Sequence, residues 1–143
     1  MSTIKKFLNL IFIDGLSGMA LGLFSTLIIG TILKQAADLI GGDFGYYLGV
    51  FAVMAQRLTG AGIGIGVAYK YKPSTYVTLS AAAAGMIGAY ATAIISGSIL
   101  SDGALVYSGP GDPLSAFIAA LAGIAVGSLP AGKTKLDLLI TPA

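Results

Sequence analysis

Arg57 is the only arginine in the chain, and it stands inside a long apolar segment. A guanidinium near the centre of a bilayer costs at least ~2.5 kcal/mol unless it is paired or hydrated. Its planar fork of N–H donors suits bidentate contacts with polar or anionic groups. Arg57 therefore indicates a binding role, with a structural ion pair to Asp14 as the alternative.

The stretch after Arg57 carries glycine at every second position: 60, 62, 64 and 66. Glycine lowers helix stability by ~1 kcal/mol relative to alanine, so four in one apolar segment are costly. One explanation is a thin helix crossed closely by several neighbours. The other is a broken helix at 57–66 whose backbone lines a cavity, as in many transporter sites. Gln56 and Thr59 flank this stretch and are candidates to contact a hydroxylated ligand.

Asp14 interrupts another apolar segment, together with Gly15. A carboxylate at membrane depth faces protein or water rather than lipid. Asp14 is expected either to cap the next helix by accepting a backbone N–H or to belong to a site directly.

The composition indicates an integral membrane protein. The 143 residues are 56% hydrophobic and 10% charged, whereas soluble domains run near 25% charged. Cysteine, histidine and glutamate are absent, which removes the usual zinc ligands, nucleophiles and general bases. We therefore expect no cofactor, no metal site and no catalytic residue. The net charge of +2 comes from lysines at the ends of the apolar segments, so it indicates membrane topology and not a nucleic-acid partner.

The elements that position these residues are expected to be helices in a single transmembrane domain over 1–143. Apolar segments predict about four spans, at 16–33, 45–69, 75–100 and 114–129, with a loop at 101–113. Residues 4–13 repeat apolar side chains with helical spacing and predict a short helix in the membrane interface. The alternative for 4–13 is the first turns of one long, tilted span.

Lysine placement predicts the orientation. Six lysines fall on one side of a four-span arrangement: Lys5, Lys6, Lys70, Lys72, Lys133 and Lys135. The opposite loops carry only Lys34 and are otherwise acidic. Because basic loops stay on the cytoplasmic side, the chain is predicted to be a multi-pass protein of the cell membrane with both termini in the cytoplasm.

Two further features suggest assembly. Gly18 and Gly22 form a small-xxx-small pair, which allows close helix contact. The apolar run 136–140 is too short to cross a bilayer. The chain is thus expected to work as a homo-oligomer or as one half of a longer transporter.

Three segments of the chain resemble a known protein family. They are F-I-D-G-L-S-G-M-A-L-G-L-F-S-T-L-I-I-G-T-I (12–32), L-T-G-A-G-I-G-I-G-V-A (58–68) and G-K-T-K-L-D-L-L-I-T-P (132–142). They resemble the N-terminal half of the second EIIC-type family of the phosphotransferase system, which are bacterial integral membrane proteins regarded as sugar permease subunits. The resemblance implies a fold of many helices and a sugar-like substrate in a glycine-rich pocket. Without histidine or cysteine, any phosphorylation would need partner subunits.

The sequence thus predicts a transporter, or half of one, for a sugar or similar polar solute. The expected pocket comprises Asp14, Gln56, Arg57, Thr59, Gly60, Gly62 and Gly64. The alternatives are a small oligomeric channel lined by Arg57, or a structural or regulatory membrane subunit.

Overall fold

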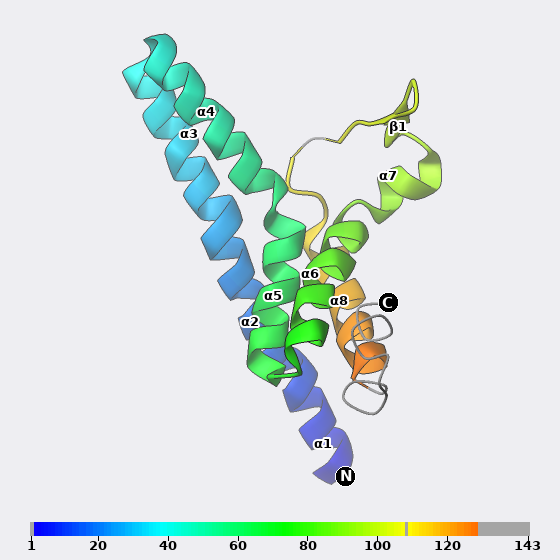
Figure 1. The fold of residues 1–143 in the computed structure, drawn as a ribbon. Helices are drawn as coiled ribbons and strands as arrows, with labels where there is room; N and C mark the ends of the chain where they lie inside the picture. The colour runs from blue at the N-terminus through cyan, green and yellow to red at the C-terminus, as the bar shows by residue number, and fades with distance from the viewer. Residues whose placement is uncertain (1, 108, 129–143) are drawn as a thin grey trace.

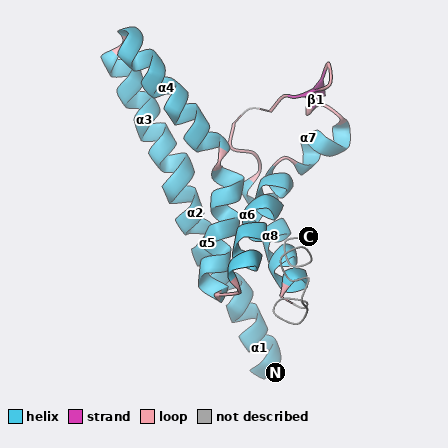
Figure 2. Cartoon of the chain, viewed as in Figure 1, coloured by secondary structure: helices cyan, strands magenta, loops and turns pink. Residues whose placement is uncertain are grey.

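The computed structural model describes residues 2–107 and 109–128, and these are mainly helical (Figures 1 and 2). The elements in chain order are α1 (Ser2–Asn9), η1 (Leu10–Gly15), α2 (Leu16–Leu23), η2 (Phe24–Ile28), α3 (Ile29–Ile40), α4 (Gly42–Arg57), α5 (Thr59–Tyr71), α6 (Thr75–Ala89), α7 (Ala91–Ser96), β1 (Leu100–Ser101), β2 (Ala104–Leu105) and α8 (Pro113–Gly127). The elements η1 and η2 are π-helical. Predictions on residues 129–143, including the end of the fourth span, Lys133, Lys135 and the apolar run, lie outside the described residues.

Elements α1 to α3 form one continuous helix, Thr3–Ile40, of 38 residues. A separate interfacial helix at 4–13 is therefore wrong, and the alternative of one long helix is observed. The predicted helix start at Asp14 is also wrong, because Asp14 lies inside η1 and the helix continues through it. The apolar residues on both sides sustain the helix, and the irregularity at Asp14 and Gly15 takes the form of a π-helical segment instead of an end. The helix ends at Gly41, whose φ is 68°.

The expected second span is bent. Helices α4 and α5 meet at Leu58 with an angle of 50° between them. Within the described residues, one helix is long and apolar enough to cross a membrane, and the bent pair raises this to two. Helices α6 and α8 are apolar but shorter. The four predicted spans and the cytoplasmic placement of both termini stay predictions.

The expected third span also ends early, since α6 stops at Ala89 and α7 follows after Tyr90. Strands β1 and β2 then pair in a small antiparallel hairpin, which begins at Leu100, the last residue of the predicted third span, and continues into the predicted loop. Asp112 starts α8, because its carboxylate accepts the N–H of Leu114, and Pro113 occupies the first turn.

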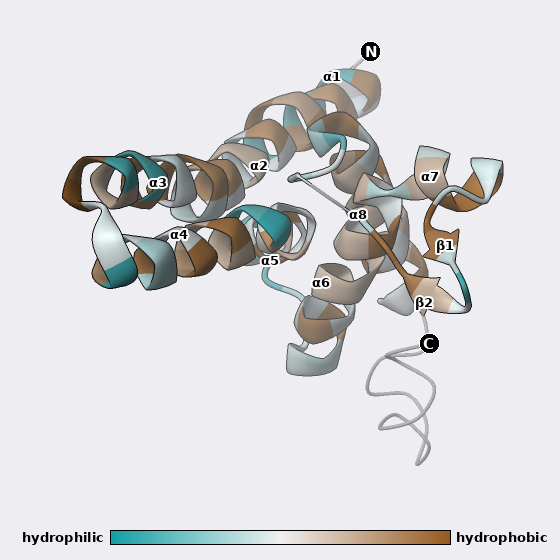
Figure 3. Cartoon of the chain, turned by 90° about the horizontal axis from the view of Figure 1, so that it is seen from above, coloured by the Kyte–Doolittle hydropathy of each residue, from teal (hydrophilic) through white to brown (hydrophobic). Residues whose placement is uncertain are grey.

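Helix α5 is the centre of the bundle, with α2, α6 and α8 packed around it (Figure 1). Its Ile63 and Val67 side chains are fully buried. Helices α3 and α4 pack on each other and extend away from this bundle as an antiparallel pair (Figure 1). Both helices carry hydrophobic residues along their length (Figure 3). Helix α4 ends at Arg57, two residues before α5 begins.

Candidate functional site

Helices α4 and α5 are separated by one residue, Leu58, where φ is −81° and ψ is −2°. The Leu58 N–H bonds to the carbonyl of Ala55, at 3.2 Å, instead of continuing the α-helical ladder. The Thr59 hydroxyl donates to the carbonyl of Gln56, at 2.6 Å. The backbone oxygens released by the bend thus find donors within the protein, as a membrane interior requires.

A chain of polar side chains crosses from this bend to the long helix. The Oγ1 atoms of Thr59 and Thr26 are 3.2 Å apart. The side-chain nitrogen of Gln56 donates to the Thr31 hydroxyl, at 3.3 Å. Thr59 is fully buried and Thr26 is 7% exposed. Because these groups satisfy one another, Gln56 and Thr59 hold the bent helix pair against the long helix.

The Thr26 end of this chain lies in η2, so a π-helical segment faces the helix break across the interface. π-helical segments and interrupted helices both occur frequently at functional sites in membrane proteins. Here two backbone irregularities from distant parts of the sequence meet at one level of the fold.

Arg57 lies on the exposed side of the break and contacts the loop that precedes α8. Its guanidinium carbon is 5.4 Å from the ring centroid of Tyr107, a cation–π contact. The Tyr107 ring packs on Tyr90, with centroids 4.9 Å apart. The Tyr90 hydroxyl donates to the carbonyl of Gly109 at 2.5 Å, and the Asp112 N–H bonds to α6. These contacts fix the Tyr107 ring beside Arg57.

Asp14 is far from this group. Its neighbour Gly15 packs against Tyr71, at the other end of α5: a Cβ on Gly15 would lie 2.7 Å from the Tyr71 hydroxyl. Thr26 lies at the level of the break, and twelve residues of helix from Asp14 to Thr26 cover about 18 Å. A pair between Asp14 and Arg57 is therefore wrong. The ion pair found in the described part of the chain is Lys34–Asp38, at 3.4 Å.

Gly62 and Gly66 pack against α2. A Cβ on Gly62 would lie 2.7 Å from the Thr26 methyl carbon, and one on Gly66 would overlap the carbonyl of Gly18. Gly18 and Gly22 in turn have no room for a side chain against α5. The contact between α2 and α5 is thus made backbone to backbone, which explains the glycines on both helices.

Gly60 and Gly64 pack on the opposite side of α5, against α6. A Cβ on Gly60 would lie 2.8 Å from the carbonyl oxygen of Gly85, and one on Gly64 would overlap that of Ala81. The predicted thin helix between several neighbours therefore describes α5. The predicted break exists but is confined to Leu58, and 60–66 is regular helix.

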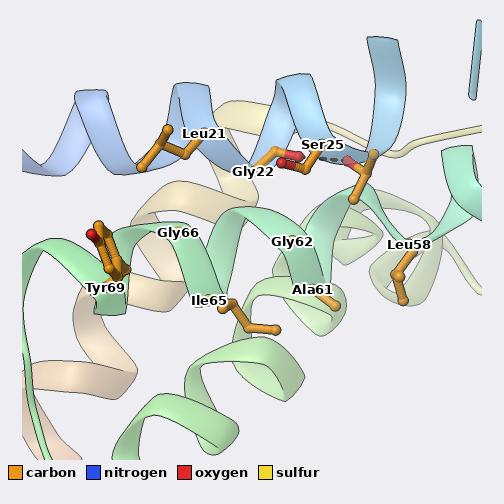
Figure 4. A pocket seen from close by; sticks show the side chains of 10 residues that line it. Leu21, Gly22, Ser25, Leu58, Ala61, Gly62, Ile65, Gly66 and Tyr69 are labelled. Carbon is orange, nitrogen blue, oxygen red and sulfur yellow. Dashed lines mark hydrogen bonds between the residues drawn. The ribbon is translucent and has the colours of Figure 1, made fainter. Parts of the chain in front are cut away.

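A shallow groove of about 400 Å³ runs beside the contact of α2 and α5 (Figure 4). It is lined by Leu21, Gly22, Ser25, Thr26, Leu58, Ala61, Gly62, Ile65, Gly66 and Tyr69. Of the predicted pocket residues only Gly62 lines it. The groove ends at Leu58, next to the break.

A family model described as "Phosphotransferase system, EIIC" matches residues 13–143. The chain belongs to this family. The resemblance that its motifs indicated is thereby confirmed. Proteins of the EIIC family are membrane transport components and are not themselves catalytic. No match was found among curated proteins or among solved structures.

Sequence reasoning missed four residues of this EIIC chain that surround the break: Thr26, Thr31, Tyr90 and Tyr107. Thr26 had a signal, because it continues the spacing of Gly18 and Gly22 by four residues and so belongs to the face that meets α5. Tyr107 lies in a loop, where no periodicity shows which helix it contacts.

Proposed function

We propose that this EIIC chain binds a sugar or similar polar solute at the break between α4 and α5. The observation that supports it is the combination of an exposed guanidinium, a helix break and a facing π-helical segment at one level. Arg57 supplies N–H donors directed to a ligand, and Gln56, partly exposed beside it, is the second candidate contact.

The depth of the break supports this proposal. The Tyr71 end of α5 and the turn at Gly41 are separated, along the long helix, by the 26 residues that follow Gly15, or about 39 Å. A bilayer with its interfacial regions is about 40–45 Å thick. Thr26 lies about 17 Å from the Tyr71 end, so the break would be near the middle. Transporter sites are commonly found at that depth.

The other predicted pocket residues take different roles in this proposal. Thr59 holds α5 against the long helix, and Gly60 and Gly64 allow α5 to pack closely on α6. Gly62 borders the groove of Figure 4. Asp14 lies about 18 Å away and has no direct contact with the solute.

The proposed transporter needs partners. Arg57 is exposed on a side where a membrane protein must be covered by protein or water. We infer that a second copy or a second membrane half lies on this side, with the lipid bilayer around the whole. A phosphoryl group would come from phosphotransferase-system subunits.

The test is uptake of a panel of radiolabelled sugars into proteoliposomes containing the full chain. We expect uptake of at least one sugar, and a loss of at least tenfold in Arg57→Ala. Lys70→Ala is the matched control: it removes an exposed cation at the far end of the same bent helix pair and should leave uptake unchanged. Equal uptake by the wild type and Arg57→Ala would remove the break from the transport mechanism. Ion currents through planar bilayers without solute would favour the channel instead.

A further inference from the structure

Arg57 has no carboxylate partner among the described residues. Asp14 lies about 18 Å away by helix length. Asp38 lines the same hollow as Arg57, but it pairs with Lys34, which lines that hollow too. Asp112 caps α8, and neither Asp43 nor Asp102 forms an ion pair with another described residue. The guanidinium thus stands near mid-membrane with no described carboxylate at ion-pair distance.

The contact with Tyr107 does not replace that counter-charge. A cation over an aromatic ring is attracted by the ring quadrupole, but the site keeps its full positive charge. The ring contact places the guanidinium carbon 5.4 Å from the ring centroid, and among the described residues Arg57 makes no ion pair or hydrogen bond that would occupy its five N–H donors. The Tyr107 ring, itself held by Tyr90, therefore orients the guanidinium and leaves its donors available to a ligand.

We propose that the solute carries an oxyanion, so that the physiological substrate is an acidic sugar and not a neutral one. This inference rests on the proposed function. A carboxylate or phosphate matches the guanidinium fork with two parallel N–H···O bonds. It also supplies the missing charge in a place where an unpaired cation is costly.

The size of the expected preference follows from charge-assisted hydrogen bonding. A hydrogen bond to a charged group contributes about 1 kcal/mol more than a neutral one, so each bond to an oxyanion raises the affinity over a hydroxyl by about fivefold, and the two bonds of a bidentate pair raise it by about 30-fold. The preference should weaken with added salt if the site is hydrated, because mobile ions screen the pair.

The experiment is equilibrium binding to the full chain in lipid nanodiscs, with galactose, galacturonate and galactose 6-phosphate as matched ligands. We expect at least one anionic sugar to bind about tenfold or more tightly than galactose. The advantage should fall to about twofold or less in Arg57→Gln and persist in Lys70→Gln. The two anionic arms distinguish a carboxylate from a phosphate.

The outcomes separate the two proposals. If galactose binds the wild type as tightly as both anions, the charged-solute inference is overturned while a solute site stands. If none of these three ligands binds, and glucose, glucuronate and glucose 6-phosphate also do not bind, the proposed function is overturned as well. A preference that disappears equally in Lys70→Gln reflects the overall field of the protein and overturns the pairing with Arg57. The wild-type comparison needs no variant, so misfolding of Arg57→Gln leaves the test intact.

Discussion

Replacing Gly64 by alanine should destabilise the bundle although alanine is the better helix former. A Cβ at this position overlaps the carbonyl of Ala81 and lies 2.6 Å from its carbonyl carbon and 3.0 Å from the Cα of Ala82. The carbonyl-carbon contact is about 0.8 Å inside the 3.4 Å at which ordinary contact begins. All three atoms are backbone, so α5 and α6 must separate. Overpacking lowers the free energy of unfolding by about 1–3 kcal/mol. The higher helix propensity of alanine raises it by about 1 kcal/mol.

Because the contacts are short and made to backbone atoms, the upper end of the overpacking cost applies, and the net expectation is a loss of about 2 kcal/mol, or a fall of about 4–8 °C in the unfolding midpoint. Thermal unfolding in detergent micelles, followed by circular dichroism, measures it. Gly49→Ala in α4 is the control, because its Cβ would meet only the Ala37 Cβ at an ordinary 3.8 Å. That variant should be unchanged or more stable by up to about 1 kcal/mol. If Gly64→Ala were as stable as Gly49→Ala, the close packing of α5 would be refuted.

Three further predictions concern the residues around the break. Thr59→Val should cost about 1–3 kcal/mol in the same unfolding assay, because the buried Thr26 hydroxyl and the partly buried Gln56 carbonyl both lose a hydrogen-bond partner; an unchanged midpoint would contradict this. Asp112→Ala should cost about 1 kcal/mol through loss of the α8 cap, and Asp112→Asn should restore most of it. Tyr107→Leu should weaken sugar binding about 3- to 30-fold by releasing Arg57, whereas Tyr107→Phe should bind normally; equal affinities of the two variants would exclude the ring contact.

The sequence was most informative where a local pattern determined the structure. The glycines after Arg57 left two predictions open, a thin, closely packed helix and a broken helix. Helix α5 is the closely packed helix, and the break is confined to Leu58. Glycines four residues apart share a helix face, so 60 and 64 form one seam and 62 and 66 the opposite one. This double pattern was readable from spacing alone.

Other features depend on contacts between distant segments. Thr26 meets Thr59 only because α2 packs on α5 with one particular register, which the glycine contacts set. Asp14 and Gly15 looked like a helix boundary because both are poor helix formers. The surrounding apolar residues kept the helix continuous and turned that boundary into a π-helical segment. Tyr107 reaches Arg57 through a loop that local propensity does not describe.

The central claim, that a solute occupies the helix break, is tested most directly by protection of a single thiol. The chain has no cysteine, so Leu58→Cys introduces one at an exposed position, where the leucine is 54% accessible. Ile118→Cys, on an exposed face of α8, is the control. A small, membrane-permeant maleimide should alkylate Leu58→Cys at least fivefold more slowly when the tightest-binding sugar of the panel saturates the protein, and Ile118→Cys at an unchanged rate. Equal alkylation rates of Leu58→Cys with and without the bound sugar would contradict the account.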